Sequence, residues 1–213
     1  MGRPRREPGQ RSTRDRILQV SIVLFTDQGF ANTSFRNIAD ALGLTESAIY
    51  RHFANKDEVL DTILDQFQDQ IYQPLPSPPK GGADGSLIAN ILTGLPRLLL
   101  TQPLFLQTSR LLLGELQHNE RIRSFVKEAF VIRANTYVES LIQEISDSSV
   151  TAVQEKSIAL MVNSFRFGWV YSTFVLQSPT LNDLPELERE LNDISNFLDQ
   201  AISNQIIRQD SQR

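Results

Sequence analysis

The chain has 213 residues, no cysteine, two histidines and a formal net charge of −4. The absence of cysteine excludes disulfides, thiolate catalysis and cysteine-ligated metal, and two histidines make a histidine-rich metal site improbable. No apolar run is long enough to span a bilayer, and the polar, basic N-terminus does not resemble a signal peptide, so we expect a cytoplasmic protein that binds no membrane.

The net charge conceals an asymmetry along the chain. Residues 1–60 hold nine Lys or Arg against seven Asp or Glu, whereas the rest hold twelve against eighteen. A basic N-terminal part on an acidic body suggests that only this part approaches a polyanion, although a basic run is also typical of a solvated tail.

The pattern of apolar residues predicts helices throughout. Residues 1–12 contain proline and glycine without apolar periodicity, which predicts a disordered basic tail. Helical periodicity then predicts four short helices, over 13–28, 34–42, 45–53 and 55–72.

A stretch rich in proline and glycine, residues 73–85, predicts a linker or an irregular loop. The segments after it are again helical in pattern, with interruptions at Pro96 and Pro103. These predicted segments are 86–100, 103–117, 119–145, 150–177 and 184–207. We therefore predict an all-α protein with an N-terminal unit over 13–58, whose last helix reaches about residue 72, and a larger body over 86–213.

Three residues of the N-terminal unit meet the steric demands of a helix-turn-helix. Ala39 is small where a second helix would cross, Gly43 is free to adopt a left-handed turn, and Ile49 is an apolar anchor. If Ile49 points inward, a polar face remains for a DNA major groove. That face consists of Glu46, Ser47, Tyr50 and Arg51.

The stretch "GFANTSFRNIADALGLTESAIYRHFANKDEVL", residues 29–60, resembles the DNA-binding domain of the TetR/AcrR family of transcriptional regulators. The resemblance implies double-stranded DNA as a partner and no catalytic residue, cofactor or metal. It also implies a role for each matching residue. Phosphate contacts fall on Thr33, Ser34, Arg36, Tyr50, His52 and Lys56, and base-edge contacts on Thr45, Glu46, Ser47 and Ala48. For Arg51 the resemblance leaves two alternatives, a side chain that faces the DNA groove or one that faces solvent.

Each of these side chains also has an interpretation without DNA. Taken alone, His52 is consistent with a side chain that fills a gap beside Phe53, and Arg36 with a charged side chain exposed to solvent. Glu46 fits a first-turn carboxylate stabilised by the helix dipole, but it also fits an acceptor for cytosine N4 that repels phosphates.

The end of the chain contains a candidate dimer interface, because a short recognition helix reads few bases and a two-fold dimer reads two half-sites. The family resemblance implies that the last two helices form half of an intermolecular bundle; packing within the chain's own core is the alternative. The proposed interface residues are Met161, Phe165, Gly168, Leu184, Leu187, Leu191, Ile194 and Leu198, of which the last five follow an a/d-like spacing.

Aromatic residues of the body are candidates for a pocket that takes a small apolar or amphipathic effector, although such residues are also typical of core. The candidates are Phe105, Arg110, Phe130, Tyr137, Phe165 and Trp169. The resulting hypothesis is a homodimeric repressor of transcription that binds a palindromic operator and is released by a ligand. The alternatives are a DNA-binding regulator that acts through a protein partner, and an enzyme. Carboxylates available to an enzyme are Glu115, Glu120, Glu139 and Glu144, which show neither a metal-binding nor a nucleophile–base pattern.

Overall fold

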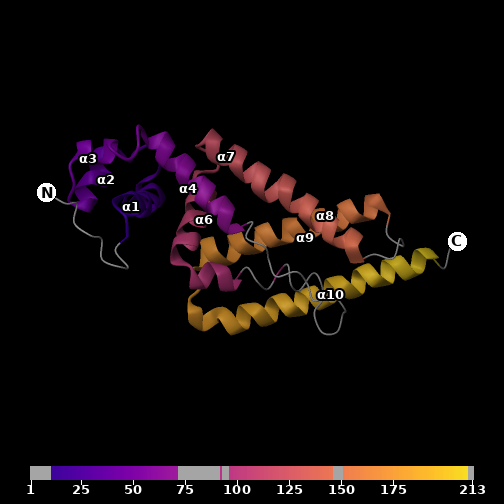
Figure 1. Cartoon of the computed structure of the whole chain (residues 1–213). Coiled ribbons are helices and arrows are strands. Elements are labelled where there is room, and N and C mark those ends of the chain that lie inside the picture. The colour runs from indigo at the N-terminus through magenta and orange to yellow at the C-terminus, as the bar shows by residue number, and fades with distance from the viewer. Residues whose placement is uncertain (1–10, 72–91, 93–95, 146–150, 211–213) are drawn as a thin grey trace.

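The computed structural model describes residues 11–71, 92, 96–145 and 151–210, without the side chains of 141, 144, 145, 199 and 201–210. Of the tail predicted over 1–12, residues 1–10 lie outside the described residues, as does the loop predicted over 73–85, whereas Ser12 is the N-cap of α1. Within these ranges every regular element is a helix, which confirms the predicted all-α fold (Figure 1). The elements are α1 (Thr13–Gln28), α2 (Phe35–Leu42), α3 (Glu46–Tyr50), α4 (Lys56–Ile71), α6 (Pro103–Glu115), α7 (Glu120–Val126), η1 (Lys127–Arg133), α8 (Ala134–Ile145), α9 (Ala152–Val170), η2 (Tyr171–Gln177), η3 (Leu181–Asp183) and α10 (Leu184–Asp210).

Local sequence sets both ends of α1. The Ser12 hydroxyl accepts the N–H of Asp15, and the Asp15 carboxylate accepts the N–H of Ser12, so two otherwise unpaired donors are satisfied. The helix stops at Gly29, whose φ of +86° lies in a region that favours glycine.

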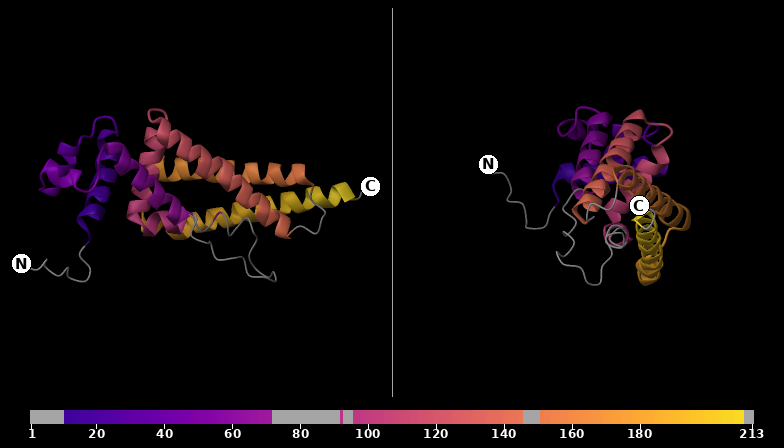
Figure 2. Two further views of the ribbon diagram at one scale, coloured as in Figure 1. Left: turned by 45° about the horizontal axis from the view of Figure 1, so that its top comes forward. Right: turned by 90° about the vertical axis from the view of Figure 1, so that its right-hand side faces the viewer.

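The first four helices and one leucine of α6 enclose an apolar core at one end of the elongated molecule (Figure 2). We refer to these helices, α1 to α4, as the head. Its core, the head cluster, consists of Ile17, Leu18, Ile22, Phe25, Phe35, Ile38, Ala39, Ile49, Phe53, Val59, Ile63 and Leu111.

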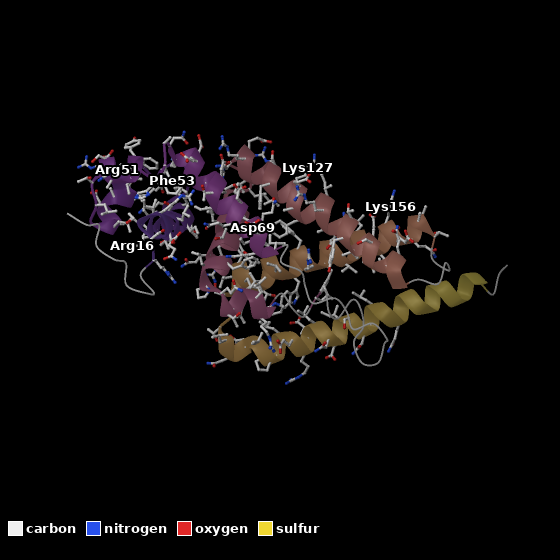
Figure 3. The ribbon with its side chains drawn as sticks, viewed as in Figure 1. Arg16, Arg51, Phe53, Asp69, Lys127 and Lys156 are labelled. Carbon is white, nitrogen blue, oxygen red and sulfur yellow. The ribbon has the colours of Figure 1, made fainter. Side chains whose placement is uncertain are left out.

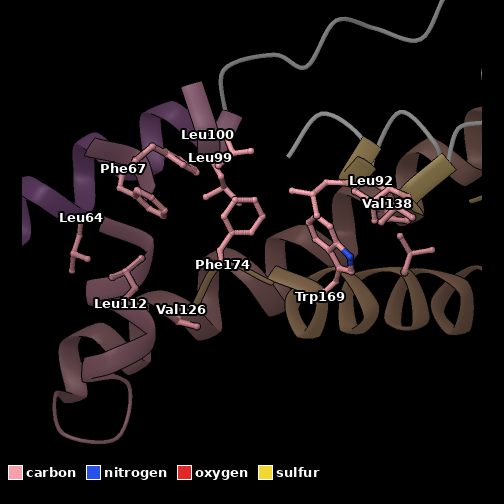
Figure 4. Close-up of a cluster of buried hydrophobic side chains, with 14 of the residues drawn as sticks. Leu64, Phe67, Leu92, Leu99, Leu100, Leu112, Val126, Val138, Trp169 and Phe174 are labelled. Carbon is pink, nitrogen blue, oxygen red and sulfur yellow. The ribbon is translucent and has the colours of Figure 1, made fainter. Parts of the chain in front are cut away.

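Helix α4 serves two cores at once. Val59 and Ile63 lie in the head cluster, whereas Leu60, Leu64 and Phe67 lie in a second core, the body cluster, part of which Figure 4 shows. The body cluster consists of Leu60, Leu64, Phe67, Leu92, Leu99, Leu100, Phe105, Leu112, Ile122, Val126, Val138, Ile142, Ala159, Val162, Trp169, Phe174, Leu187 and Leu191. Apolar side chains on two sides of one helix therefore fix the head against the body.

Two polar pairs set the register of α8 against α9. Asn163 Nδ2 donates to Asn135 Oδ1 at 2.7 Å, and Gln143 Nε2 donates to Glu155 Oε2 at 2.9 Å. The pairs follow opposite orders along the two helices, which are therefore antiparallel. Because Asn163 and Glu155 are buried, a shift of one turn would leave these groups unpaired in an apolar setting.

Two of the predicted helical segments contain π-helical turns. Segment η1 joins α7 to α8, and η2 continues α9 until Ser178, which ends the helix with a φ of 55°. A π-turn accommodates an extra residue, so it changes which side chains face the core on either side of it. The predicted single helices over 119–145 and 150–177 are interrupted in this way.

The apolar seam of α10, which the sequence predicts as part of a dimer interface, packs against the body within the single chain. Leu187 and Leu191 are buried in the body cluster of the same chain. The other seam residues pack against that cluster and are partly buried; these are Leu184, Ile194 and Leu198. Within the single chain the seam therefore packs against the chain's own core. Among the α10 side chains that the structure describes, Phe197 is exposed at 69%.

Candidate nucleic-acid interface

The turn between α2 and α3 has the geometry that the sequence predicts. Gly43 adopts a left-handed conformation (φ 66°, ψ 33°), and its N–H donates to the Asp40 carbonyl oxygen at 3.2 Å. The N–H of Leu44 donates to the Ala39 carbonyl oxygen at 2.9 Å, which closes the end of α2. Ala39 is buried, so α3 crosses α2 at a small side chain.

Helix α3 is anchored by one side chain and exposes most of the others. Ile49 is completely buried in the head cluster. At the start of the helix, Glu46 is exposed, and the hydroxyls of Thr45 and Ser47 lie 2.9 Å apart on the surface. A row of short polar groups at a helix N-terminus has the size and hydrogen-bonding capacity to meet base edges in a major groove.

The other end of α3 exposes three larger predicted contact residues. Arg51 and His52 are exposed, and Figure 3 shows Arg51 at the tip of the molecule, away from the body. Tyr50 is 56% exposed, and its ring packs edge-on against Phe35 with centroids 4.9 Å apart. That contact orients the phenol and leaves its hydroxyl end free to reach a phosphate. Ala48, the remaining predicted contact on α3, is partly buried.

At the start of α2, Ser34 and Arg36 are exposed. The Ser34 hydroxyl accepts the N–H of Asn37 at 3.2 Å, so it caps the helix and lies at its positive end. The Arg36 guanidinium lies 4.0 Å from the Asp40 carboxylate, with both side chains more than 70% exposed. Such a pair contributes little stability, and Arg36 is available to an anion.

Thr33 and Lys56 are corrections to the predicted phosphate contacts. The Thr33 side chain is buried, and its hydroxyl donates to the carbonyl oxygens of Leu24 and Gly29 at 3.3 and 2.9 Å. A β-hydroxyl next to the N-cap satisfies its hydrogen bonds within the protein in this way, so it ties the α1–α2 turn to α1.

The Lys56 ammonium is also turned into the protein. It donates to the carbonyl oxygens of Phe30, of Ala31 at 3.2 Å and of Thr33 at 2.8 Å, and it lies 4.4 Å from the centroid of the Phe30 ring. Burial lowers the pKa of Lys56, while the charges of Asp57 and Glu115 act in the opposite direction. The lysine stabilises the α1–α2 turn from within.

The structure adds Arg14 to the predicted residues. Its guanidinium lies 4.7 Å from the centroid of the Phe53 ring and donates to the Thr62 hydroxyl at 3.3 Å, so α1, the segment between α3 and α4, and α4 meet at one cation. Arg11 and Arg16 are exposed at the same end of α1. In the sequence, these arginines were indicated by the count of six basic against two acidic residues in the first sixteen.

The exposed face of α4 is acidic. Asp57, Asp61, Asp65 and Asp69 recur every four residues, and all four are exposed. Asp61 pairs with Arg121 of α7 at 2.6 Å, and Figure 3 shows Asp69 toward the body. Negative charge here would repel a phosphate backbone, whereas α2 and the end of α3 expose Arg36 and Arg51.

The predicted pocket residues lie mostly within the body cluster. Phe105 stacks on Phe67 with centroids 4.4 Å apart, and Trp169 is buried. Phe130 and Phe165 pack against the same cluster. Tyr137 is a correction, because its side chain is exposed on the outer surface of α8 and forms no part of an apolar lining.

Arg110 binds the end of η2. It donates to the Phe174 carbonyl oxygen at 3.3 Å and to the Ser178 hydroxyl at 3.2 Å. Buried polar atoms without a hydrogen-bond partner in the described part of the chain are Ser21 Oγ, Asn163 Oδ1 and Trp169 Nε1.

Neither a metal site nor a membrane-spanning helix is found among the residues that the structure describes. Among residues 11–71, 92, 96–145 and 151–210, no three His, Cys, Asp or Glu side chains come together in a way that would hold a metal ion. None of the helices described combines the length and apolar character that crossing a membrane requires.

The part of the chain that contains this surface matches a known protein family. Residues 17–63 match the model of the bacterial regulatory proteins of the tetR family. The transcriptional repressor KstR2 of Mycolicibacterium smegmatis is 34% identical over 61 residues, which are 29% of this chain and 30% of the repressor. The match therefore covers less than a third of this relative's length, and the residues that match the family model run from within α1 to within α4.

Solved structures resemble the chain over nearly its whole length. A transcriptional regulator of Aquifex aeolicus VF5 has a TM-score of 0.66 at 20% identity, with 88% of this chain and 99% of that chain covered. SmeT, the repressor of a Stenotrophomonas maltophilia multidrug efflux pump, has a TM-score of 0.66 at 22% identity in its complex with triclosan, with 87% and 90% covered. The head and the helical body therefore share one fold with these proteins.

Proposed function

Because the chain belongs to the TetR/AcrR family of transcriptional regulators, we propose that it represses transcription by binding a specific DNA sequence through α2 and α3. One observation carries the proposal: the buried Ile49 anchors α3 while Thr45, Glu46 and Ser47 stay exposed at its N-terminus. Arg36, Tyr50, Arg51 and His52 flank this row and supply groups for phosphates.

The experiment is selection of bound fragments from a random DNA pool, followed by gel shifts of the selected sequence at several salt concentrations. We expect one preferred palindrome and an affinity that falls linearly on a log–log salt plot. An absence of any sequence preference would contradict the proposal. Arg36→Ala should reduce the salt slope by about one while it leaves the selected sequence unchanged.

A palindromic site requires two copies of the chain, and we propose that they associate through α9. Leu160, Met161, Phe167 and Tyr171 are exposed there at helical spacing, and Gly168 lies among them with open space above its Cα. These four side chains are uncharged, and the small glycine would allow a neighbouring helix to approach closely. Phe197 of α10 would add an apolar side chain to the same contact. This proposed contact shares Met161 and Gly168 with the interface predicted from the sequence.

We further propose that an apolar or amphipathic small molecule releases the protein from DNA by binding among the aromatic side chains of the body. Phe67 contacts Phe105, Phe125 and Phe130, and Phe130 in turn contacts Phe167. The unpartnered Asn163 Oδ1 and Trp169 Nε1 would supply an acceptor and a donor. The solved complex of SmeT with triclosan supports an apolar phenol as the first probe.

Trp169 is the one tryptophan of the chain, so its fluorescence reports directly on this region. We expect saturable quenching by triclosan and a weaker response in Phe105→Ala. A probe that binds without weakening the DNA complex would contradict release. If no apolar probe binds, the alternative of a protein partner gains support.

A further inference from the structure

The turn between α1 and α2 is held by two charged side chains, one from α4 and one from α6. Glu115, the last residue of α6, accepts the N–H of Phe30 through Oε1 at 2.9 Å. Lys56, the first residue of α4, donates to the Phe30 carbonyl oxygen. Both polar groups of one residue are thus bound by side chains that lie 26 and 85 positions away in the sequence.

The glycine before Phe30 shows how closely Glu115 approaches. A Cβ on Gly29 would lie 3.2 Å from Glu115 Oε1, so the carboxylate lies directly over the Gly29–Phe30 peptide. The φ of +86° at Gly29 leaves the next N–H directed out of α1 toward that oxygen. A substitution at Gly29 would therefore meet both backbone strain and the carboxylate.

The charges of the two side chains support each other across the turn. Glu115 favours the protonated form of Lys56 and so opposes the effect of burial, which lowers the lysine pKa. Lys56 then keeps its bonds to Ala31 and Thr33, the residues that lead into α2. The start of α2 depends on a cation in the head and on an anion from the body.

Further side-chain hydrogen bonds hold the turn between α6 and α7, which follows Glu115. The Arg123 guanidinium donates to the carbonyl oxygens of Leu116 at 3.3 Å and Gln117 at 3.0 Å, which stiffens the turn after α6. Arg121, on the same corner, pairs with Asp61 of α4 at 2.6 Å. The corner between α6 and α7 therefore contacts the head at two separate points.

We propose that Glu115 is a positioning residue for DNA binding, which ties the α1–α2 turn, and through it α2 and α3, to the end of α6. The inference rests on the proposed function and adds to it a specific route by which the body sets the geometry of the DNA-facing helices. A displacement of the end of α6 moves the oxygen that binds Phe30, so the entry of α2 moves with it. Glu115 touches no DNA in this arrangement and acts through the backbone of the head.

The test compares three variants of the full chain by hydrogen exchange at the Phe30 amide and by affinity for the DNA that the unmodified protein selects. Glu115→Ala removes the acceptor, Glu115→Gln keeps an oxygen at the same position, and Glu128→Ala removes a carboxylate that pairs with Arg133 on η1. We expect Glu115→Ala to raise the exchange rate about tenfold and to weaken specific binding several-fold, with binding to random DNA unchanged. Glu115→Gln should restore most of both properties, and Glu128→Ala should change neither.

Two results would overturn the inference: an unchanged Phe30 exchange rate in Glu115→Ala, or Glu115→Gln as impaired as Glu115→Ala. If the alanine variant does not fold, Glu115→Asp withdraws the oxygen by one methylene and should raise exchange in the same way. Failure of the unmodified protein to select any DNA would contradict the proposed function instead. The exchange arm would then still decide whether Glu115 holds the turn.

Discussion

The Lys56 ammonium donates to the carbonyl oxygen of Thr33 at 2.8 Å, so two residues that match phosphate contacts in sequence are bound to each other. Thr33 is buried, and its own hydroxyl serves α1. The pair therefore maintains the shape of the turn between α1 and α2.

Replacing Lys56 distinguishes a role in holding the turn from a direct contact with a DNA phosphate. We expect Lys56→Met to lower the free energy of unfolding by about 1–2 kcal/mol, because three carbonyl oxygens lose a charged donor that solvent partly screens. Urea denaturation measures this loss, with Lys127→Met on the exposed surface of η1 as the control. DNA affinity should fall without a change in the salt slope; a slope lower by about one would place Lys56 on a phosphate instead.

The sequence was sufficient for the helices and for the helix-turn-helix, because these depend on local signals. Ser12 and Ser34 cap their helices, Gly43 takes the left-handed turn, and Ile49 is the buried anchor. The direction of the Lys56 side chain was beyond such signals, since it is set by carbonyl oxygens 23 to 26 residues earlier in the chain.

The predictions for the body had a different difficulty. The spacing of Leu187 and Leu191 correctly indicates that α10 buries an apolar stripe. A stripe of this kind fits a second copy of the chain as well as the chain's own core, so the spacing alone does not say which of the two it faces. The π-helical turns η1 and η2 also shift the apolar period without a sequence signal of their own.

Glu46 tests how α3 reads bases. We expect Glu46→Ala to relax the preference at one base pair by about tenfold, because a carboxylate accepts from cytosine N4 and is repelled by the acceptor oxygens of guanine and thymine. Affinity for random DNA should stay equal or rise, since a negative charge is removed. Asp65→Ala, on the acidic face of α4, is the matched control. A uniform loss across all sequences would mean that Glu46 only stabilises its helix.

Gly43 tests the turn between the two helices. An alanine there would meet no atom within 4 Å, so its cost arises from the left-handed backbone alone. We expect Gly43→Ala to lower the free energy of unfolding by about 1 kcal/mol and Gly43→Asn by less, because asparagine tolerates this conformation better. Thermal or urea denaturation measures both, and equal stability of all three proteins would contradict the assignment.

Gly168 tests the proposed dimer. Alanine at Gly168 or at Gly114 meets no atom within 4 Å in the single chain, and either substitution favours the helix by up to about 1 kcal/mol. Only Gly168 lies on the α9 face that we assign to a second copy. Sedimentation equilibrium should therefore show weaker self-association for Gly168→Ala and no change for Gly114→Ala. The same association constant in both variants would place the interface elsewhere.

Asp183 gives a pH dependence whose sign is defined. The N–H and hydroxyl of Thr180 donate to its carboxylate and lower the pKa of Asp183 from 3.8. Since the folded state favours the ionised form, this contribution to stability is present above pH 3.8 and is lost as the pH falls through the lower, folded-state pKa. The difference in unfolding free energy between the unmodified protein and Asp183→Asn should accordingly shrink on acidification. A constant difference would contradict the cap.

Helix α4 has Val59 and Ile63 in the head cluster and Leu60 and Leu64 in the body cluster. The head therefore cannot be separated from the body without the loss of apolar contacts in both clusters. A hybrid regulator that joins this head to a foreign sensor would have to import all of α4, a leucine at the position of Leu111 and an acceptor at the position of Glu115. Cutting the chain between α3 and α4 would expose two half-cores at once, and the exchange of sensors in the laboratory should succeed only where the junction lies beyond α4.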